Sequence, residues 1–286
     1  MNIIHSPQAM TAWSERLRRE GLTIGFVPTM GALHDGHRAL IRAARLTCDA
    51  LVVSIFVNPA QFGPKEDLAK YPRPIARDRA LCRAEGVDVC FEPTAQAMYP
   101  DGFQTTVSLP VIARRWEGDV RPHHFSGVAT VVTKLFGIVR PHVALFGQKD
   151  FQQAALVRQL VKDLNLVVQV AIHPTIREPD GLAMSSRNVY LTPHERSVAT
   201  TLYKSLQAGA DAIRQRISNG QAIHRIMTRI IQQEPAMTID YLAVCDPRTL
   251  EPLTSVTSRT VLLGAVRLGS VRLIDNLLVT GPAKRA

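Results

Sequence analysis

Hydrophobic and polar positions follow two alternating patterns along the first part of the chain. Short apolar runs are typical of strands covered on both faces, whereas apolar residues that recur with a helical period are typical of helices. The apolar runs predict strands over residues 23–27, 51–57, 87–91, 143–146 and 167–172, and a further strand is predicted over residues 104–109. The helical periodicity predicts helices over residues 6–20, 36–47, 75–85, 127–139 and 150–164. This alternation implies a mainly parallel sheet that binds ligands at the carboxyl ends of its strands.

The pattern changes after about residue 192. Two amphipathic helices are predicted over 193–216 and 221–233, separated by Asn219-Gly220. Strands over 238–244 and 259–265 follow, and then the apolar-rich segment 271–276. We therefore predict an α/β protein with two domains. Residues 1–180 form a Rossmann-like domain with a parallel sheet, and residues 181–286 form a smaller α+β domain.

The composition is that of a soluble globular protein. Of 286 residues, 46% are apolar and 20% are charged. No apolar run approaches the ~18 residues of a membrane helix, and the first residues lack the pattern of a signal peptide. The four cysteines, Cys48, Cys82, Cys90 and Cys245, show no Cys-x-x-Cys spacing. This argues against a zinc site and fits a reducing compartment, so we predict a cytoplasmic protein that does not bind membranes.

The net charge of +10 indicates an anionic partner. Nucleotides, acidic metabolites and nucleic acids all meet this description. The basic residues are spread along the chain, however, and the dense groups 16–19 and 284–285 are not interleaved with aromatic residues. We therefore favour small anionic substrates and expect no nucleic acid partner. A basic nucleic-acid-binding module is the alternative from another functional class.

The segment from Val27 to His37, V-P-T-M-G-A-L-H-D-G-H, joins a predicted strand to a predicted helix. The first backbone N–H groups of a helix are unpaired, and the helix dipole adds partial positive charge there. Two imidazoles at this point, from His34 and His37, can donate hydrogen bonds to phosphate oxygens. The alternative is a pair of loop histidines near a helix start with no ligand.

Three more loop segments carry polar residues that a fold does not need. Gln61 in segment 58–62 can bind a polar substrate through the donor and acceptor groups of its side-chain amide. Lys149, with Asp150 as a predicted helix cap, follows a buried strand and suits phosphate charge. Ser185, Ser186 and Arg187 suit triphosphate oxygens and a leaving pyrophosphate. Each segment alone also fits an ordinary solvated turn, as does the basic segment 121–125. Together they predict a site for a nucleoside triphosphate and a small polar substrate, without a P-loop motif.

These segments resemble the pantoate–β-alanine ligases (pantothenate synthetases), a family of the HIGH-motif nucleotidyltransferase superfamily. Residues 28–37 look like the ATP-binding signature of that family, and residues 53–62 and 71–73 resemble its pantoate-side segment. Further similar segments are 121–128, 146–150, 180–188 and 272–276. The His-x-Gly-His element alone marks only the superfamily, but all segments in this order are specific to the family.

The resemblance implies a two-step ligation in which ATP is a substrate and Mg²⁺ accompanies it. Pantoate would attack the α-phosphate of ATP to give pantoyl adenylate and pyrophosphate, and the amine of β-alanine would then displace AMP to give pantothenate. The resemblance also implies a homodimer and a smaller domain that closes over the site. The runner-up is another nucleotidyltransferase of the same superfamily, which would leave the nucleotide on its product.

The resemblance also assigns site residues. The catalytic residues would be His37, usually named as the acid, together with His34, Lys149 and Arg187. Pantoate and β-alanine would be held by Gln61 and Gln153, and Asp78 is the candidate near the metal. The residues that would bind ATP are Met30, Gly31, Ala32, Leu33, His34, Asp35, Gly36, His37, Gly147, Gln148, Lys149, Asp150, Ile176, Met184, Ser185, Ser186 and Arg187. Gln148 departs from the glutamate usual in the family, and we expect little effect from this change.

Overall fold

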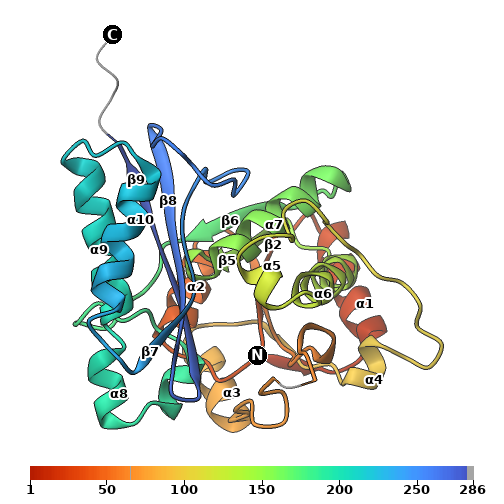
Figure 1. Cartoon of the computed structure of the whole chain (residues 1–286). Coiled ribbons are helices and arrows are strands. Elements are labelled where there is room, and N and C mark those ends of the chain that lie inside the picture. Colours follow the sequence, from red (N-terminus) through yellow and green to blue (C-terminus); the bar gives the residue numbers. More distant parts are fainter. Residues whose placement is uncertain (65, 282–286) are drawn as a thin grey trace. The chain divides into compact units, whose positions relative to one another are not determined.

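The computed structural model describes residues 1–64 and 66–281, which divide into two compact units (Figure 1). The first unit comprises Met1–Ala113, Arg121–Gln148 and Leu156–Pro174. The second unit comprises Arg114–Val120, Lys149–Ala155 and the chain from Thr175 onward. The chain thus passes between the units several times.

The first unit is built on strands that alternate with helices. Its strands are β1 (Asn2–Ile4), β2 (Ile24–Thr29), β3 (Ala50–Ile55), β4 (Val89–Phe91), β5 (Val143–Gly147) and β6 (Gln169–His173). Its helices are α1 (Pro7–Arg19), α2 (Asp35–Arg45), α3 (Ile75–Ala84), α4 (Ala95–Met98), α6 (His124–Val139) and most of α7 (Phe151–Asp163), with the short 3-10 helix η1 (Pro59–Gln61). The 3-10 helix η2 (Gln148–Asp150) links β5 to α7.

The six strands form one sheet in the order β1-β4-β3-β2-β5-β6, and every neighbouring pair is parallel. The chain steps outward from β2 through β3 to β4, and then returns to place β5 on the other side of β2. The strand order therefore reverses between β2 and β5. In open parallel sheets, ligands bind outside the carboxyl ends of the strands at such a switch point. The predicted parallel α/β architecture is confirmed.

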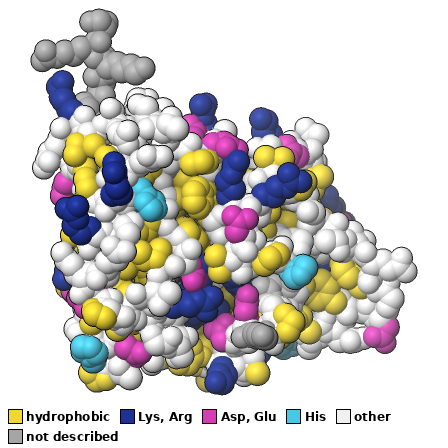
Figure 2. Space-filling model, in the orientation of Figure 1, with side chains coloured by type: hydrophobic (Ala, Val, Ile, Leu, Met, Phe, Trp, Pro, Cys, Tyr) yellow, Lys and Arg dark blue, Asp and Glu magenta, His cyan; other side chains and the backbone are white. Residues whose placement is uncertain are grey.

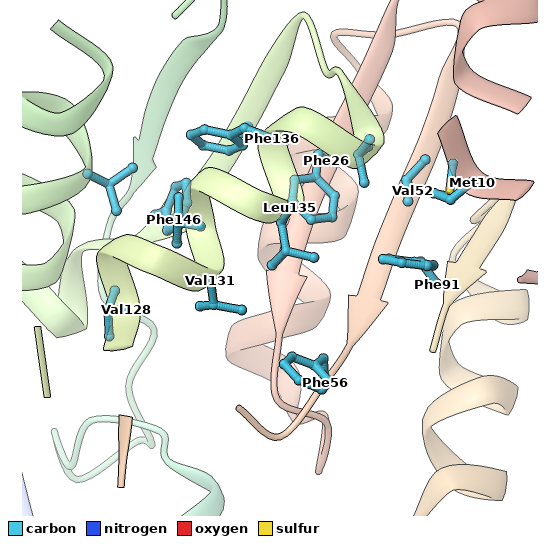
Figure 3. Close-up of a cluster of buried hydrophobic side chains, with 14 of the residues drawn as sticks. Met10, Phe26, Val52, Phe56, Phe91, Val128, Val131, Leu135, Phe136 and Phe146 are labelled. Atoms are coloured by element: carbon cyan, nitrogen blue, oxygen red, sulfur yellow. The ribbon is translucent and has the colours of Figure 1, made fainter. Parts of the chain in front are cut away.

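Helices cover both faces of this sheet because successive strand residues point to opposite sides. Phe26, Val52 and Phe91 face helices α1 and α6 in one core cluster, which Figure 3 shows with Met10 and Leu135. The neighbouring strand residues belong to a second cluster with side chains of α2 and α3, and they are Val27, Leu51, Val53, Cys90, Val143 and Leu145. The two clusters explain why these strands are continuous apolar runs in the sequence.

The second unit contains an antiparallel sheet of three strands in the order β7-β8-β9 (Figure 1). The strands are β7 (Met237–Cys245), β8 (Arg259–Leu268) and β9 (Val271–Thr280). The helices are α5 (Glu117–Val120), α8 (Pro193–Val198), α9 (Thr201–Arg214) and α10 (Gly220–Ile231), with the 3-10 helix η3 (Ser186–Tyr190). Helices α9 and α10 pack on the sheet and enclose a separate apolar core that includes Leu206, Ile223 and Leu262.

Two sequence predictions of secondary structure are wrong. Residues 104–109 form no strand, because the backbone N–H of Val107 donates to the hydroxyl of Thr130 on α6 at 2.9 Å instead of pairing with the sheet. The helix predicted over 193–216 is interrupted between α8 and α9. There the hydroxyl of Thr200 donates to the carbonyl of Ser197 at 3.1 Å, the kind of local bond that competes with helix continuation.

Within the described residues, no helix has the length and apolar character needed to span a bilayer.

Candidate functional site

The turn after β2 adopts left-handed backbone conformations at two successive residues. Gly31 has φ +82° and Ala32 has φ +50°. The N–H of Gly31 donates to the hydroxyl of Thr29 at 3.1 Å, and that hydroxyl donates to the carbonyl of Ser54 on β3 at 2.6 Å. The left-handed region disfavours a residue with a side chain such as Ala32, so other contacts must hold the turn in place.

Asp78 of α3 supplies those contacts. Its two carboxylate oxygens accept the backbone N–H groups of Ala32 and Leu33, both at 2.8 Å. The residue is only 1% exposed. Burial raises the pKa of Asp78, and the two N–H donors act against that rise. The observed role of Asp78 is therefore to hold the turn, and its assignment near a metal stays a prediction.

Helix α2 begins with a reciprocal cap formed by two histidines. His34 is the N-cap, and its Nδ1 accepts the N–H of Gly36 at 3.1 Å. The Nδ1 of His37 accepts the N–H of His34 at 3.3 Å, and the two ring centroids are 4.2 Å apart. An Nδ1 that accepts a hydrogen bond carries no proton, so each neutral ring bears its proton on Nε2. Both rings can therefore donate Nε2–H at the positive end of the helix.

Gln61 lies in a chain of side-chain hydrogen bonds at the carboxyl end of β3. Its Nε2 lies 3.2 Å from the Sδ of Met30, and its Oε1 accepts the Nδ2 of Asn58 at 3.0 Å. The Oδ1 of Asn58 accepts the hydroxyl of Tyr99 at 2.7 Å. Burial raises the pKa of Tyr99 to about 12, so this hydroxyl keeps its proton and donates. The structure brings together the predicted residues Met30 and Gln61, from loops after two neighbouring strands.

The backbone around Gln61 is held by the basic segment 121–125. The side chains of Arg121 and His124 both contact the carbonyl oxygen of Gln61, at 3.2 and 3.0 Å. Arg121 also forms a two-pronged ion pair with Glu66, at 2.8 and 2.5 Å. Gly127 allows this approach, because an added Cβ would lie 2.3 Å from the carbonyl oxygen of Ala60. In the structure, then, Arg121 and His124 support the Gln61 loop.

Gly147 ends β5 and Gln148 follows it, on the other side of the switch point from the His34 turn. Strand β5 pairs with β2 through Gly25 to Val143 and Phe26 to Ala144. The predicted residues Met30–His37, Gly147 and Gln148 therefore leave the carboxyl ends of the two strands where the sheet order reverses. This is the position at which a parallel sheet binds its ligand.

The other predicted residues belong to the second unit. Lys149 is partly exposed, with its Nζ 3.6 Å from the Oδ1 of Asp150, and its carbonyl oxygen accepts the Nδ2 of Asn276 at 2.9 Å. Gln153, on the first turn of α7, is partly buried. Its neighbour Gln152 is 5% exposed and binds the backbone of Arg115 and Glu117 through its amide.

The segment from Ile176 to Arg187 folds back on itself. The N–H of Met184 donates to the carbonyl of Ile176 at 3.0 Å, which places these two predicted residues side by side. Ser185 then caps η3, because its hydroxyl accepts the N–H of Arg187 at 3.3 Å. Ser185, Ser186 and Arg187 are all partly exposed at this short helix start.

Several supporting residues were not assigned as site residues from the sequence. Asn58 and Asn276 lie inside segments already recognised as similar to the family, but no local pattern indicates what they bind. Tyr99 and Arg177 gave no signal at all. Tyr99 donates to Asn58, 41 residues away, and the guanidinium of Arg177 donates to Asp275 and Asn276, 98 and 99 residues away.

Basic side chains on the face shown in Figure 2 lie singly or in small groups with acidic side chains between them. Among the described residues of the chain, basic side chains form ion pairs such as Arg42 with Glu85 at 2.6 Å and Arg79 with Glu92 at 2.6 Å. This dispersed arrangement differs from the continuous basic stripe that is typical of nucleic-acid-binding surfaces.

Comparison with known proteins agrees with this geometry. A family model described as Pantoate-beta-alanine ligase matches residues 2–278. A pantothenate synthetase from Desulfatibacillum aliphaticivorans is 51% identical over 276 residues, covering 96% of this chain and 98% of the relative.

Solved structures show the same similarity. The crystal structure of pantothenate synthetase from Thermus thermophilus superimposes with a TM-score of 0.92 at 45% identity, covering 97% of this chain and 99% of that one. A pantoate-beta-alanine ligase from Francisella tularensis, complexed with beta-gamma ATP and beta-alanine, has a TM-score of 0.81 at 35% identity and covers 97% of both chains. The chain therefore belongs to the pantoate-beta-alanine ligase family and is a ligase of pantothenate biosynthesis.

Proposed function

We propose that this enzyme condenses D-pantoate with β-alanine through a pantoyl adenylate. In the first step a carboxylate oxygen of pantoate attacks the α-phosphorus of ATP, and the bond to the β-phosphate oxygen breaks to release pyrophosphate. In the second step the amine of β-alanine attacks the acyl carbon. AMP leaves with the bonding electrons, the nitrogen loses a proton, and pantothenate forms. No Ser or Cys nucleophile is needed, because a carboxylate is already nucleophilic.

The observation that carries this proposal is the pair of histidines at the start of α2. Because each Nδ1 accepts a backbone N–H, the neutral rings of His34 and His37 carry their protons on Nε2. They can donate to phosphate oxygens as negative charge shifts toward pyrophosphate. Donors held in place before the reaction stabilise a transition state without reorganisation. The Francisella ligase with bound beta-gamma ATP and beta-alanine supports ATP and β-alanine as substrates here.

Other residues receive roles by the same reasoning. Lys149 and Arg187 would contribute positive charge to phosphate groups, and Ser185 and Ser186 would contribute hydroxyl donors. The amide of Gln61 would bind the polar groups of pantoate, since it lies beside Met30 and its backbone is held by Arg121 and His124. Gln153 would share in binding pantoate or β-alanine. Gly31 and Gly147 would allow the backbone to approach the nucleotide.

Magnesium is assigned no protein-bound position. Among residues 1–64 and 66–281, no group of three or more His, Cys, Asp or Glu side chains is placed to hold a metal ion. Both oxygens of Asp78 accept backbone N–H groups, so we derive no step through a metal. Mg²⁺ commonly binds nucleotide phosphates with few protein ligands, and its entry with ATP stays a prediction. The homodimer, the cytoplasmic location and the domain boundary at residue 180 also stay predictions.

Product analysis tests the proposal directly. The enzyme is incubated with ATP, Mg²⁺, D-pantoate and β-alanine, and each component is then omitted in turn. We expect AMP and pantothenate in equal amounts only in the complete mixture. Pyrophosphate without AMP in that mixture would point instead to a nucleotidyltransferase that keeps the nucleotide on its product. No turnover at all would contradict both enzyme hypotheses.

A further inference from the structure

Two successive polar residues are buried in the middle of strand β9. Asp275 is 5% exposed and Asn276 is 1% exposed. Opposite them on β8 lie Gly264 and Leu263, which offer no polar side chain. Buried carboxylates and amides are costly unless they are hydrogen-bonded. The partners of Asp275 and Asn276 therefore indicate what these two residues are for.

Asn276 holds the backbone of Lys149. Its Nδ2 donates to the carbonyl oxygen of Lys149 at 2.9 Å, although the two residues are 127 positions apart. Lys149 is the middle residue of η2, the short 3-10 helix directly before α7. Because this contact is to the backbone, it sets where the Lys149 side chain starts and leaves its ammonium group available to a ligand.

Asp275 holds the guanidinium of Arg177. Two parallel hydrogen bonds join them, at 2.6 and 2.9 Å, which is the geometry of the strongest charged pairs. Arg177 also donates to the carbonyl oxygens of Gly181 at 3.0 Å and Asn276 at 3.2 Å. The guanidinium lies 3.9 Å from the centre of the Tyr203 ring. Arg177 is thereby fixed from several directions.

Fixing Arg177 also fixes the segment that ends at Ser185. Arg177 pairs with Ala183 in an antiparallel bridge, and the N–H of Glu178 donates to the carbonyl of Leu182 at 2.8 Å. Gly181, with φ +95°, makes the turn between them. An added Cβ there would lie 2.4 Å from the Tyr203 ring. The Asp275–Arg177 pair therefore determines where Ser185, Ser186 and Arg187 begin.

We propose that Asp275 and Asn276 are a positioning pair that holds Lys149 and the Ser185–Arg187 segment in one fixed arrangement for phosphate binding. All of these residues belong to the second unit. The assignment rests on the proposed function, in which both segments contact ATP phosphates. It predicts that disturbing the pair slows adenylation even though neither residue touches substrate. A shift of about 1 Å in a positioning group can cost ~10²-fold in rate.

The test is a burst experiment with two variants of Asn276. Asn276→Asp keeps the shape but places an oxygen opposite the Lys149 carbonyl, and Asn276→Ala removes the contact. With ATP, Mg²⁺ and pantoate but no β-alanine, each active site releases one pyrophosphate. The burst amplitude counts folded sites, and the burst rate constant measures adenylation. We expect full amplitude with a rate constant at least ~10-fold lower, within the range for misplaced groups.

Asn219→Asp is the matched control. Its Oδ1 caps α10 by accepting the N–H of Ala222 at 2.9 Å, and Asp keeps that acceptor. We expect the control to match the wild-type burst. Arg177→Lys, which keeps the charge but loses the two-pronged geometry, is expected to lower the rate constant as the Asn276 variants do.

Three outcomes would contradict the proposal. Wild-type rate constants at full amplitude in both Asn276 variants would overturn the positioning role. A lower amplitude with an unchanged rate constant would reduce the pair to a structural role and overturn the assignment as well. A wild-type enzyme with no pyrophosphate burst would overturn the proposed function, and this assignment with it.

Discussion

The carboxylate of Asp78 accepts the backbone N–H of Leu33 at 2.8 Å, and its other oxygen accepts the N–H of Ala32 at the same distance. One side chain on α3 thus holds the turn between β2 and the histidine cap of α2. The contact spans 45 residues of sequence. It stabilises the left-handed conformation of Ala32, which a side chain disfavours, and so holds the turn that leads into the candidate ATP site.

Asn in place of Asp78 tests this role. Asp78→Asn presents an NH₂ group to one of the two N–H donors, so one buried donor loses its partner. We expect the free energy of unfolding to fall by about 1–3 kcal/mol and the KM for ATP to rise. Urea unfolding and initial rates measure the two effects. Asp163→Asn on the exposed end of α7 is the control, because Asn keeps the oxygen that accepts from Gln159. Wild-type values in Asp78→Asn would remove this residue from the support of the turn.

The two nitrogens of His37 can be separated by substitution. Asn at this position places an amide oxygen near the site of Nδ1, so His37→Asn keeps an acceptor for the N–H of His34 but loses the Nε2–H donor. We expect unchanged thermal stability with adenylation slowed ~10²–10³-fold, the cost of one missing donor to developing negative charge. His37→Ala should lose stability as well. Normal adenylate formation in a single turnover of either variant would refute the role of His37.

Lys149 is expected to act through its ammonium group, since Asn276 contacts only its backbone. Lys149→Ala keeps that backbone contact, so we predict a normal thermal unfolding midpoint with most activity lost. Lys162→Ala, on the exposed last turn of α7, removes the same charge elsewhere and should leave turnover unchanged. A Lys149→Ala enzyme with near-normal turnover would exclude this lysine from the site.

The hydrogen bonds and burial of His142 predict that the folded protein loses stability in acid. Its Nδ1 accepts the N–H of Ile24 at 2.9 Å, and its Nε2 lies 3.0 Å from the guanidinium of Arg18. Burial lowers the pKa of His142 below its usual 6.5, and the positive charge of Arg18 lowers it further. The negative charge of Asp49 opposes this shift but does not cancel it. The unfolded chain therefore binds a proton more readily than the folded one, and stability falls as pH drops below ~6.5. Urea unfolding at pH 7.5 and 5.5 should show this difference, which His142→Asn should reduce. An equal pH dependence in both proteins would contradict the prediction.

The resemblance described above places Gln148 where glutamate is expected. Gln keeps the size and most of the hydrogen-bonding capacity of Glu but lacks its charge. We predict that Gln148→Glu leaves the KM for ATP nearly unchanged, because Lys149 beside it is retained. Steady-state rates at varied ATP measure this. A high KM in the native enzyme that Gln148→Glu lowers would show that the missing charge matters.

Much of the candidate site could be predicted from the sequence, because its key segments are local. The start of α2 at His34 follows from a strand, a turn and a capping residue that are adjacent in the chain. The two errors have different origins, one in a contact between distant residues and one in a local hydrogen bond. Residues 104–109 carry Val107 and Leu109 at the two-residue spacing of a strand, but the backbone N–H of Val107 donates to the side chain of Thr130. Thr200 ends a helical stretch through its own hydroxyl.

The sequence by itself determined the alternation of strands and helices, the helix start that bears His34 and His37, and the positions of Gln61, Lys149 and Ser185–Arg187 in the connections that follow strands β3, β5 and β6. These features depend on periodicity and on neighbouring residues. Only the tertiary structure decided that Asp78 holds the turn at Ala32 and that Asn276 holds Lys149. Such contacts join residues far apart in the chain, and strand order and packing place them together. No local pattern records that placement, because the hydrogen-bond partner of a buried polar group depends on which elements pack around it.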